Sequence, residues 1–350
     1  MMRKIPVAIL GATGIVGQRF IQLLQDHPWF KISALSASIR SAGQTYREAC
    51  NWVLRGDPPV EVLDQTLQPL KPDLPARLVF SALPSPVARK TEPAFADAGY
   101  VVCSNASAFR QDPDVPLIIP EVNSEHIKMV EWQQAKRGWK GLIVTSPNCT
   151  TTAAVMPLKP LDQAFKINRV IATSIQAVSG AGYPGTTFID ISDNLVPYIR
   201  GEEEKIEQES LLLLGHLSER KRIPARFQIS AQANRGPIQH GHTVCVSVAF
   251  KNKPTPGAAI DVLRNYRGSE ITWRLPSAPP RPIIVRDEPD RPQPRRDRDT
   301  QNGMVATVGR VRVCPVFDLK LVSVIHNAIR GAAGGAILNA ELLVAGGYLS

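Results

Sequence analysis

Cysteine is scarce in this sequence of 350 residues, and the few present form no metal-binding or disulfide pattern. They are odd in number, widely scattered and never spaced as CxxC, which disfavours a disulfide framework and a zinc site. We therefore expect no bound metal, and free thiols of this kind are typical of the reducing cytoplasm. The five cysteines are Cys50, Cys103, Cys149, Cys245 and Cys314.

Long apolar runs are also lacking. None is long enough to span a bilayer, so we expect no membrane partner. The apolar stretch near the N-terminus is short and runs into a glycine-rich turn, unlike a signal peptide. The composition is that of an ordinary globular protein, with 43% hydrophobic and 21% charged residues. A length of 350 residues is long for one core and favours two domains.

Negative charge is in deficit, and the net charge is +10. No basic helix accompanies this excess. The densest charged stretch, residues 286–299, alternates in sign and contains prolines that prevent a regular helix. We therefore expect no nucleic-acid partner, and the positive charge favours small anionic ligands.

Strand and helix patterns alternate through the first half of the chain. Apolar strand-like runs are separated by amphipathic helical segments, and this order is typical of a parallel sheet with helices on both faces. We predict an α/β fold in which residues 1–148 form a doubly wound, Rossmann-type domain. The strands are expected at 6–10, 31–38, 77–84 and 100–107, and the helices at 11–27 and 86–99.

The sequence pattern changes after Cys149. Longer β-branched runs follow, and residues 242–250 alternate in character, which predicts a sheet with two unlike faces. We expect residues 149–325 to form an α+β domain with a mixed, mostly antiparallel sheet. An exposed apolar sheet face would need a partner, which favours self-association. The other expected elements are a helix at 202–216, a proline-rich loop at 276–294 and a final helix within 326–350.

A glycine loop follows the first strand. Gly11, Gly14 and Gly17 stand where a helix begins, and such a turn lets a pyrophosphate approach the helix N-terminus. This context favours dinucleotide binding over a purely structural turn. No acidic residue stands at the end of the second strand to hold a ribose hydroxyl. Ser38, Arg40 and Ser41 stand there instead and suit a 2′-phosphate, so we predict NADP. The alternative is that Arg40 is a solvated surface residue.

One cysteine occupies an unusual place. In the run VTSPNCTTTAAVMPL, Cys149 lies where a strand turns into a helix, a setting that lowers a thiol pKa. The alternative is a packed, inert thiol. A base is available in RGPIQHGHT, where His242 directly precedes the alternating strand and His240 is its neighbour. Together with a nicotinamide domain, the pair implies thiohemiacetal and thioester chemistry. The histidines without such a setting are His27, His126, His216 and His326.

Many short motifs together resemble one family. The sequence is similar over nearly its whole length to the aspartate-β-semialdehyde dehydrogenases of the branch common in archaea and fungi. The shared motifs, in the family's order, are GATGIVGQ, SIRSAG, FSALPS, SNASAFR, IIPEVN, SPNCTT, SIQAVSGAG, GEEEK, GHT, RPQPRRDRD, GMVATVGR and RGAAGGAILNAELL.

The resemblance implies a reaction and its catalytic residues. The reaction is the reversible, NADPH-dependent reductive dephosphorylation of L-4-aspartyl phosphate to L-aspartate 4-semialdehyde, on the route to lysine, threonine, methionine and isoleucine. Cys149 is the implied nucleophile and carries a thioester intermediate. His242 is the implied acid/base that takes the thiol proton, and Gln176 is implied to orient the acyl group. Backbone N–H groups at the helix start are candidates for holding the oxyanion.

The resemblance also implies substrate contacts. Arg235 corresponds to the clamp on the substrate carboxylate, Glu202 to the acid that receives the ammonium, and Arg110 with Lys205 to the phosphate clamp. Asn148 precedes the nucleophile as the pattern requires. Without the resemblance, GEEEK would be a solvated helix face and Arg110 a surface arginine. The further cofactor contacts implied are Thr13, Ile15, Val16, Ser81, Leu83, Ser179, Gly180 and Asn327.

Three positions depart from the family pattern, and two rival functions are compatible with the sequence. Gly236 replaces a usual valine and is expected to loosen Arg235. Gln44 replaces a frequent lysine, and His240 competes with His242 for the acid/base role.

The rival enzyme is a malonyl-CoA or succinyl-CoA reductase on the same scaffold, and the rival of another class is a non-catalytic NADP-sensing protein. The family relation further implies that the C-terminal helix joins the first domain and that the protein is a homodimer or homotetramer.

Overall fold

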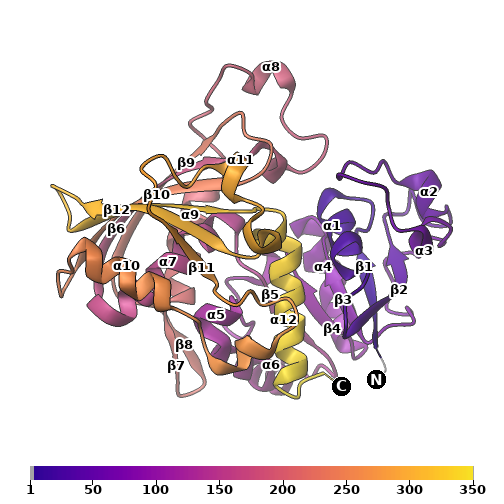
Figure 1. Ribbon diagram of the computed structural model, residues 1–350. Coiled ribbons are helices and arrows are strands. Elements are labelled where there is room, and N and C mark those ends of the chain that lie inside the picture. The colour runs from indigo at the N-terminus through magenta and orange to yellow at the C-terminus, as the bar shows by residue number, and fades with distance from the viewer. Residues whose placement is uncertain (1–3, 350) are drawn as a thin grey trace.

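A parallel sheet of five strands forms the first half of the computed structural model, which describes residues 4–349 (Figure 1). The strand order is β2-β1-β3-β4-β5, and all pairs are parallel. The last three strands are buried at every residue, as expected for a sheet covered on both faces. The strands are β1 (Ile5–Leu10), β2 (Phe30–Ser36), β3 (Leu78–Ser81), β4 (Val101–Ser104) and β5 (Leu142–Thr145).

Helices cover both faces of this sheet. The strand order reverses between β1 and β3, because β2 lies on one side of β1 and β3 to β5 lie on the other. A crevice is expected at the carboxyl ends of these two strands. The glycine loop lies at that point. The doubly wound domain predicted from the alternating pattern is therefore confirmed. Its helices are α1 (Ile15–Leu24), α2 (Tyr46–Ala49), α3 (Val60–Leu63), α4 (Ser85–Asp97), α5 (Pro120–Asn123) and α6 (Met129–Arg137).

The second half contains a mixed sheet of six strands, in the order β11-β12-β13-β10-β6-β9. Three of its five pairings are antiparallel, and two, β11 with β12 and β6 with β9, are parallel. A separate hairpin is formed by β7 (His216–Ser218) and β8 (Lys221–Ile223). The sheet strands are β6 (Ile167–Gln176), β9 (Gln228–Arg235), β10 (His242–Phe250), β11 (Ile283–Arg286), β12 (Ala306–Val313) and β13 (Leu319–Ile325).

One face of the mixed sheet is covered and the other is open. In β10, Val244, Val246 and Val248 are buried on the side covered by α7, while Cys245 points to the exposed face. The alternation expected for residues 242–250 is thus present. Ile171 of β6 is 47% exposed on the open side. The helices of this half are α7 (Cys149–Phe165), α8 (Phe188–Ile191), α9 (Glu202–Leu213), α10 (Pro256–Asn265) and α11 (Pro294–Asp297).

The C-terminal helix α12 (Gly334–Ala345) lies between the two halves (Figure 1). Ile337, Leu338 and Leu342 belong to the apolar core that also contains Val7 and Phe80 of the parallel sheet. A π-helical turn, η6 (Ile329–Ala333), precedes α12. Among residues 4–349, no helix is long and apolar enough to cross a membrane.

One expected loop contains a strand. Within residues 276–294, β11 pairs in parallel with β12, because the outer edge of β12 offers free backbone groups to an extended apolar segment. The strand itself contains no proline, and Pro282 directly precedes its first residue. The proposed domain limits of 1–148 and 149–325 remain predictions.

Candidate active site

The thiol of Cys149 and the imidazole of His242 face each other, with Sγ and Nε2 3.1 Å apart. Cys149 is the first residue of α7 and His242 the first of β10. Their pairing is possible because α7 packs directly on β10. The cysteine is half-buried and the histidine is fully buried. The two residues that the sequence singled out therefore form one pair.

The hydrogen bonds of His242 fix where its proton lies. The backbone N–H of Ala177 donates to Nδ1 at 3.0 Å, so Nδ1 must carry a lone pair. The neutral ring then holds its proton on Nε2, which faces the sulfur of Cys149. In the resting arrangement His242 therefore donates to the sulfur, and its predicted role as acceptor of the thiol proton stays a prediction.

The thiol is not activated in this arrangement. Burial and the negative charge of Glu202 raise the pKa of Cys149 to about 12, against the opposing influence of Arg110. Burial lowers the pKa of His242 to about 3. The expectation that the helix N-terminus would lower the thiol pKa is therefore wrong for the free protein, because desolvation outweighs the helix dipole. Both members of the pair are neutral at neutral pH.

Asn148 caps the helix that carries the nucleophile. Its Oδ1 accepts from the backbone N–H groups of Thr150 and Thr151 at 2.8 and 3.1 Å. These two groups are therefore already used and cannot hold an oxyanion without breaking the cap. Of the N–H groups expected for that task, the one of Cys149 itself is the remaining candidate.

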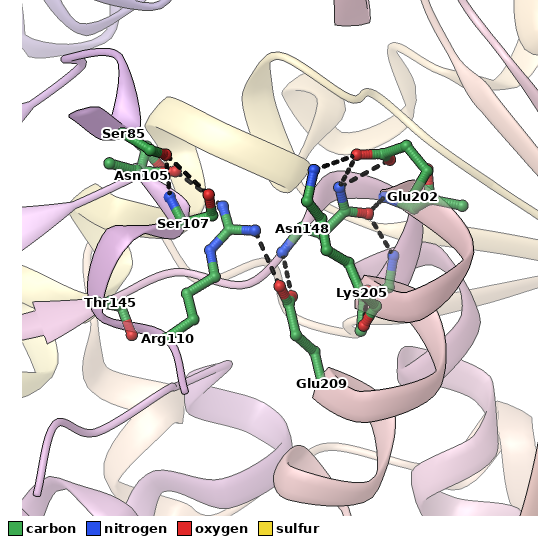
Figure 2. Close-up of polar contacts among 12 residues, drawn as sticks. Ser85, Asn105, Ser107, Arg110, Thr145, Asn148, Glu202, Lys205 and Glu209 are labelled. Atoms are coloured by element: carbon green, nitrogen blue, oxygen red, sulfur yellow. Dashed lines mark hydrogen bonds and ion pairs between the residues drawn. The ribbon is translucent and has the colours of Figure 1, made fainter. Parts of the chain in front are cut away.

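Glu202 is the centre of a buried hydrogen-bond network (Figure 2). It accepts from Nδ2 of Asn148 at 2.9 Å, Nε2 of Gln176 at 3.2 Å and Nζ of Lys205 at 2.8 Å. Burial alone would raise the pKa of Glu202, but the lysine charge and these hydrogen bonds together hold it below its usual value. One carboxylate thus fixes three residues that the sequence analysis placed in the site.

Arg110 reaches the same cleft from the loop after β4. Its Nη1 donates to Oε1 of Glu209 at 3.0 Å, and its Nη2 donates to the carbonyl of Asn105 at 2.8 Å (Figure 2). The Nε group has no hydrogen-bond partner among the described residues. Arg110 is 7% exposed, so it is a buried residue rather than a surface arginine.

Arg235 lies at the end of β9 beside His242. Its Nη1 donates to the carbonyl of Ala177 at 2.7 Å, which ties it to the same segment that holds the imidazole. The neighbouring Gly236 lies in a closely packed position and does not leave the backbone beside Arg235 unsupported. A Cβ there would lie 2.7 Å from a methyl group of Ile175, so the glycine fits a close packing contact, and its N–H bonds the carbonyl of Gln176 at 3.0 Å.

The glycine loop has the geometry of an anion cradle. Gly14 is the N-cap of α1 and provides no side-chain cap, so the first N–H groups of the helix are free for a ligand. Gly11 has a φ of +80°, and a Cβ there would lie 3.0 Å from the carbonyl oxygen of Ala82. These features fit a pyrophosphate. Thr13, Ile15 and Val16 lie on the same turn and are partly accessible.

The loop after β2 carries the predicted 2′-phosphate residues. Ser38 and Arg40 are exposed and Ser41 is half-buried, in a turn closed by the N–H of Ser41 on the carbonyl of Ser38. Gln44 bonds the carbonyl of Arg40 through its side-chain amide at 3.1 Å and so supports this turn. At the end of β3 and just beyond it, Ser81 is fully buried and Leu83 nearly so.

Three further predicted cofactor contacts cluster beside the catalytic pair. The hydroxyl of Ser179 accepts from Nδ2 of Asn327 and contacts Nδ1 of His240, each at 2.9 Å. A Cβ on Gly180 would lie 3.0 Å from Cε1 of His242. His240 is thus bound to Ser179, while His242 alone of the two contacts Cys149. This geometry favours His242 over His240 as the partner of Cys149, and its acid/base role stays a prediction.

Two further residues of the site were not predicted from the sequence. Glu209 bonds both Arg110 and the backbone N–H of Asn148, and its spacing of seven residues from Glu202 on one helix could have revealed it. Gly331 lies in η6, where a Cβ would be 2.6 Å from Cβ of Cys149. No local sequence pattern indicates the close approach of Gly331 to Cys149, because the two residues belong to segments far apart in the chain.

A parallel nucleotide-type domain with an uncapped glycine loop, joined to a domain that contributes a cysteine–histidine pair, defines a nicotinamide-dependent dehydrogenase. Two family models match the chain: "Semialdehyde dehydrogenase, NAD binding domain" over residues 6–130 and "Semialdehyde dehydrogenase, dimerisation domain" over residues 158–330. The chain belongs to the semialdehyde dehydrogenase family, which confirms the resemblance drawn from its motifs.

Individual relatives agree with this family. The chain is 50% identical over 341 residues to an aspartate-semialdehyde dehydrogenase of Methanothermobacter thermautotrophicus, covering 96% of this chain and 98% of the relative. The crystal structure of aspartate semialdehyde dehydrogenase with NADP from Candida albicans superposes with a TM-score of 0.91 at 41% identity, covering 99% of this chain and 100% of that one. A malonyl CoA reductase (NADP) of Metallosphaera sedula is 39% identical, over 100% of this chain and 99% of the relative.

Proposed function

We propose that this protein catalyses the reversible NADP-dependent interconversion of L-4-aspartyl phosphate with L-aspartate 4-semialdehyde and phosphate. The observation that carries this proposal is the 3.1 Å contact between Cys149 and His242 at the start of α7, surrounded by buried groups of both charges. The similarity to aspartate-semialdehyde dehydrogenases at up to 50% identity supports the same reaction.

Cys149 attacks the β-acyl carbon and forms a thioester, releasing phosphate. The thiol must lose its proton first. Because Nε2, which faces the sulfur, already holds the ring proton, His242 can accept the thiol proton there only after its own proton has moved to Nδ1, and that move requires the contact of Nδ1 with the N–H of Ala177 to break. His242 then places a proton near the oxygen of the thiohemiacetal. Gln176, held by Glu202, orients the acyl group.

The substrate's charges match the charges of the cleft. Arg235 offers a planar fork for the α-carboxylate. Glu202 receives the α-ammonium in exchange for one of its present donors. Lys205 is the most exposed of these donors and is therefore the one replaced. Released in this way, Lys205 joins Arg110 in binding the phosphate. Substrate binding therefore rearranges a network that is already satisfied in the free protein.

NADP fits the crevice at the carboxyl ends of β1 and β3. When bound, its nicotinamide supplies or accepts the hydride. Gly11 and Gly14 let the pyrophosphate approach α1, while Ser38, Arg40 and Ser41 surround the 2′-phosphate. Ser179, Gly180 and Asn327 lie next to His242 and would hold the nicotinamide end of the cofactor.

The protein is proposed to act as a homodimer in the cytoplasm, with a tetramer as a further assembly. One matching family model is that of a dimerisation domain. The open face of the mixed sheet and the segment that follows β6 expose large apolar side chains that a second copy could cover. These are Ile171, Phe188, Ile189, Leu195 and Tyr198.

The test is an NADP reduction assay with aspartate semialdehyde and inorganic phosphate. We expect turnover that requires phosphate and that is faster with NADP than with NAD. A malonyl-CoA reductase would instead oxidise NADPH with malonyl-CoA or succinyl-CoA and would not respond to phosphate. Tight NADP binding without turnover on any of these substrates would identify a cofactor-sensing protein. Either of these results contradicts the proposal.

A further inference from the structure

Glu209 is buried in the site but belongs to none of the roles assigned above. We propose that Glu209 is a positioning residue that holds Arg110 and the peptide before the nucleophile in one fixed arrangement. This inference rests on the proposed function, because it assumes that Arg110 binds the substrate phosphate. Glu209 itself touches neither substrate nor cofactor in this proposal.

The two carboxylate oxygens of Glu209 accept hydrogen bonds from different segments of the chain. Oε1 accepts from Nη1 of Arg110 at 3.0 Å, and Oε2 accepts from the backbone N–H of Asn148 at 2.6 Å (Figure 2). The side chain therefore bridges the loop after β4 and the turn into α7. The phosphate-binding cation and the turn that carries Cys149 are joined through a single carboxylate.

Burial makes this bridge rigid. Glu209 is 1% exposed and Arg110 is 7% exposed, and a buried charge is tolerated only when it is paired and hydrogen-bonded. Asn105 fixes a second edge of the guanidinium through its carbonyl. Because the Nε of Arg110 has no partner among the described residues, a donor remains for an incoming oxyanion.

Helix α9 presents Glu209 together with the substrate residues. Glu202, Lys205 and Glu209 are spaced i, i+3 and i+7, so they share one helical face (Figure 2). Glu202 binds the side chain of Asn148 and Glu209 binds its main chain. One rigid helix thereby sets the distance between the phosphate clamp and the nucleophile.

The variant Glu209→Gln tests this role without a large change in shape. Both partners of Glu209 are donors, and an amide offers only one acceptor oxygen, so one contact must be lost. With aspartate semialdehyde and NADP saturating, we expect the KM for inorganic phosphate to rise about tenfold. The KM for NADP should stay within about twofold. The matched control is Glu204→Gln, an exposed position on the same helix, which should change neither.

A double-mutant cycle with Arg110→Ala separates positioning from general destabilisation. Because Glu209 acts through Arg110, Glu209→Gln should raise the KM for phosphate no further once Arg110 is gone. An additive effect, or a fall in the KM for phosphate in the single variant, would overturn the inference. If Arg110→Ala alone leaves that KM unchanged, the phosphate role in the proposed function fails instead. Should Glu209→Gln not fold, Glu209→Asp provides the same comparison with the charge retained.

Discussion

The glycine loop after β1 and the cleft around Cys149 reach their geometry in different ways. The loop is one short stretch, Gly11 to Val16, whose backbone conformation makes the site. The cleft is assembled from side chains on α7, β6, α9, β9 and β10, and each is held by another charged or polar group. The geometry of a contiguous loop depends on residues that permit a turn. The geometry of a site assembled from distant side chains depends on which buried charges pair with one another.

The largest effect is expected when the sulfur is removed. This change should abolish catalysis around Cys149 and leave NADP binding at the glycine loop intact. Cys149→Ala should reduce kcat by at least about 10⁴-fold, because no other described thiol lies beside His242. The dissociation constant for NADP should change by less than about twofold, measured by calorimetry. Cys314→Ser is the control, since a hydroxyl can also accept the N–H of Phe317. Appreciable residual turnover would show that the nucleophile lies elsewhere.

Acid should act on the catalytic region more than on the nucleotide region. Burial lowers the pKa of His240 to about 4 and the pKa values of His242 and His326 to about 3. Below their ordinary pKa of 6.5 the unfolded chain binds protons that the folded protein does not. The free energy of unfolding should therefore fall as the pH drops from 6.5 toward 4, by about 1.4 kcal/mol per pH unit for each histidine.

Urea unfolding of variants measures this contribution. His326→Asn keeps an acceptor for the N–H groups of Ala328 and Ile329, and it should lower the slope of stability against pH by one proton. The exposed His216→Asn should leave the slope unchanged. Equal slopes in both variants and in the parent protein would contradict the assignment of a neutral, buried histidine cluster.

Packing behind the nucleophile should matter less than the nucleophile itself. Gly331→Ala would place a Cβ 2.6 Å from Cβ of Cys149 and 3.0 Å from its Cα, so the turn into α7 must shift. We expect kcat to fall about 10²-fold while NADP binding is retained. Gly257→Ala on α10 is the control, because a Cβ there meets no atom within 4 Å. Unchanged kcat in Gly331→Ala would show that the turn can adapt.

The difference between the two regions explains what the sequence could predict. The doubly wound sheet followed from the alternation of apolar runs and helices, and the roles of Gly11 and Gly14 followed from their place between strand and helix. His242 was found because it begins an alternating strand. These features are local, so neighbouring residues are enough to recognise them.

The charge state of the catalytic pair could not be predicted in the same way. A helix N-terminus argues for a thiolate at Cys149, but the folded cleft surrounds the sulfur with burial and the charge of Glu202. The bond from Ala177 that fixes the His242 proton joins residues 65 positions apart. Desolvation and tautomer depend on the complete fold. Gly331 was missed for a similar reason, because its close approach to Cys149 joins segments that are far apart in the chain.

The smallest effect is expected in the nucleotide region, where single side chains add to a site made mostly by backbone. Arg40→Ala should raise the KM for NADP about tenfold by removing one charge-assisted contact with the 2′-phosphate, and leave the KM for NAD unchanged. Arg274→Ala, an exposed arginine on another segment, is the control. Because Ser38 and Ser41 share the same turn, closed by a backbone hydrogen bond, selectivity should weaken rather than vanish. A parallel rise in the KM values for both cofactors would mean that Arg40 supports the loop instead of reading the phosphate.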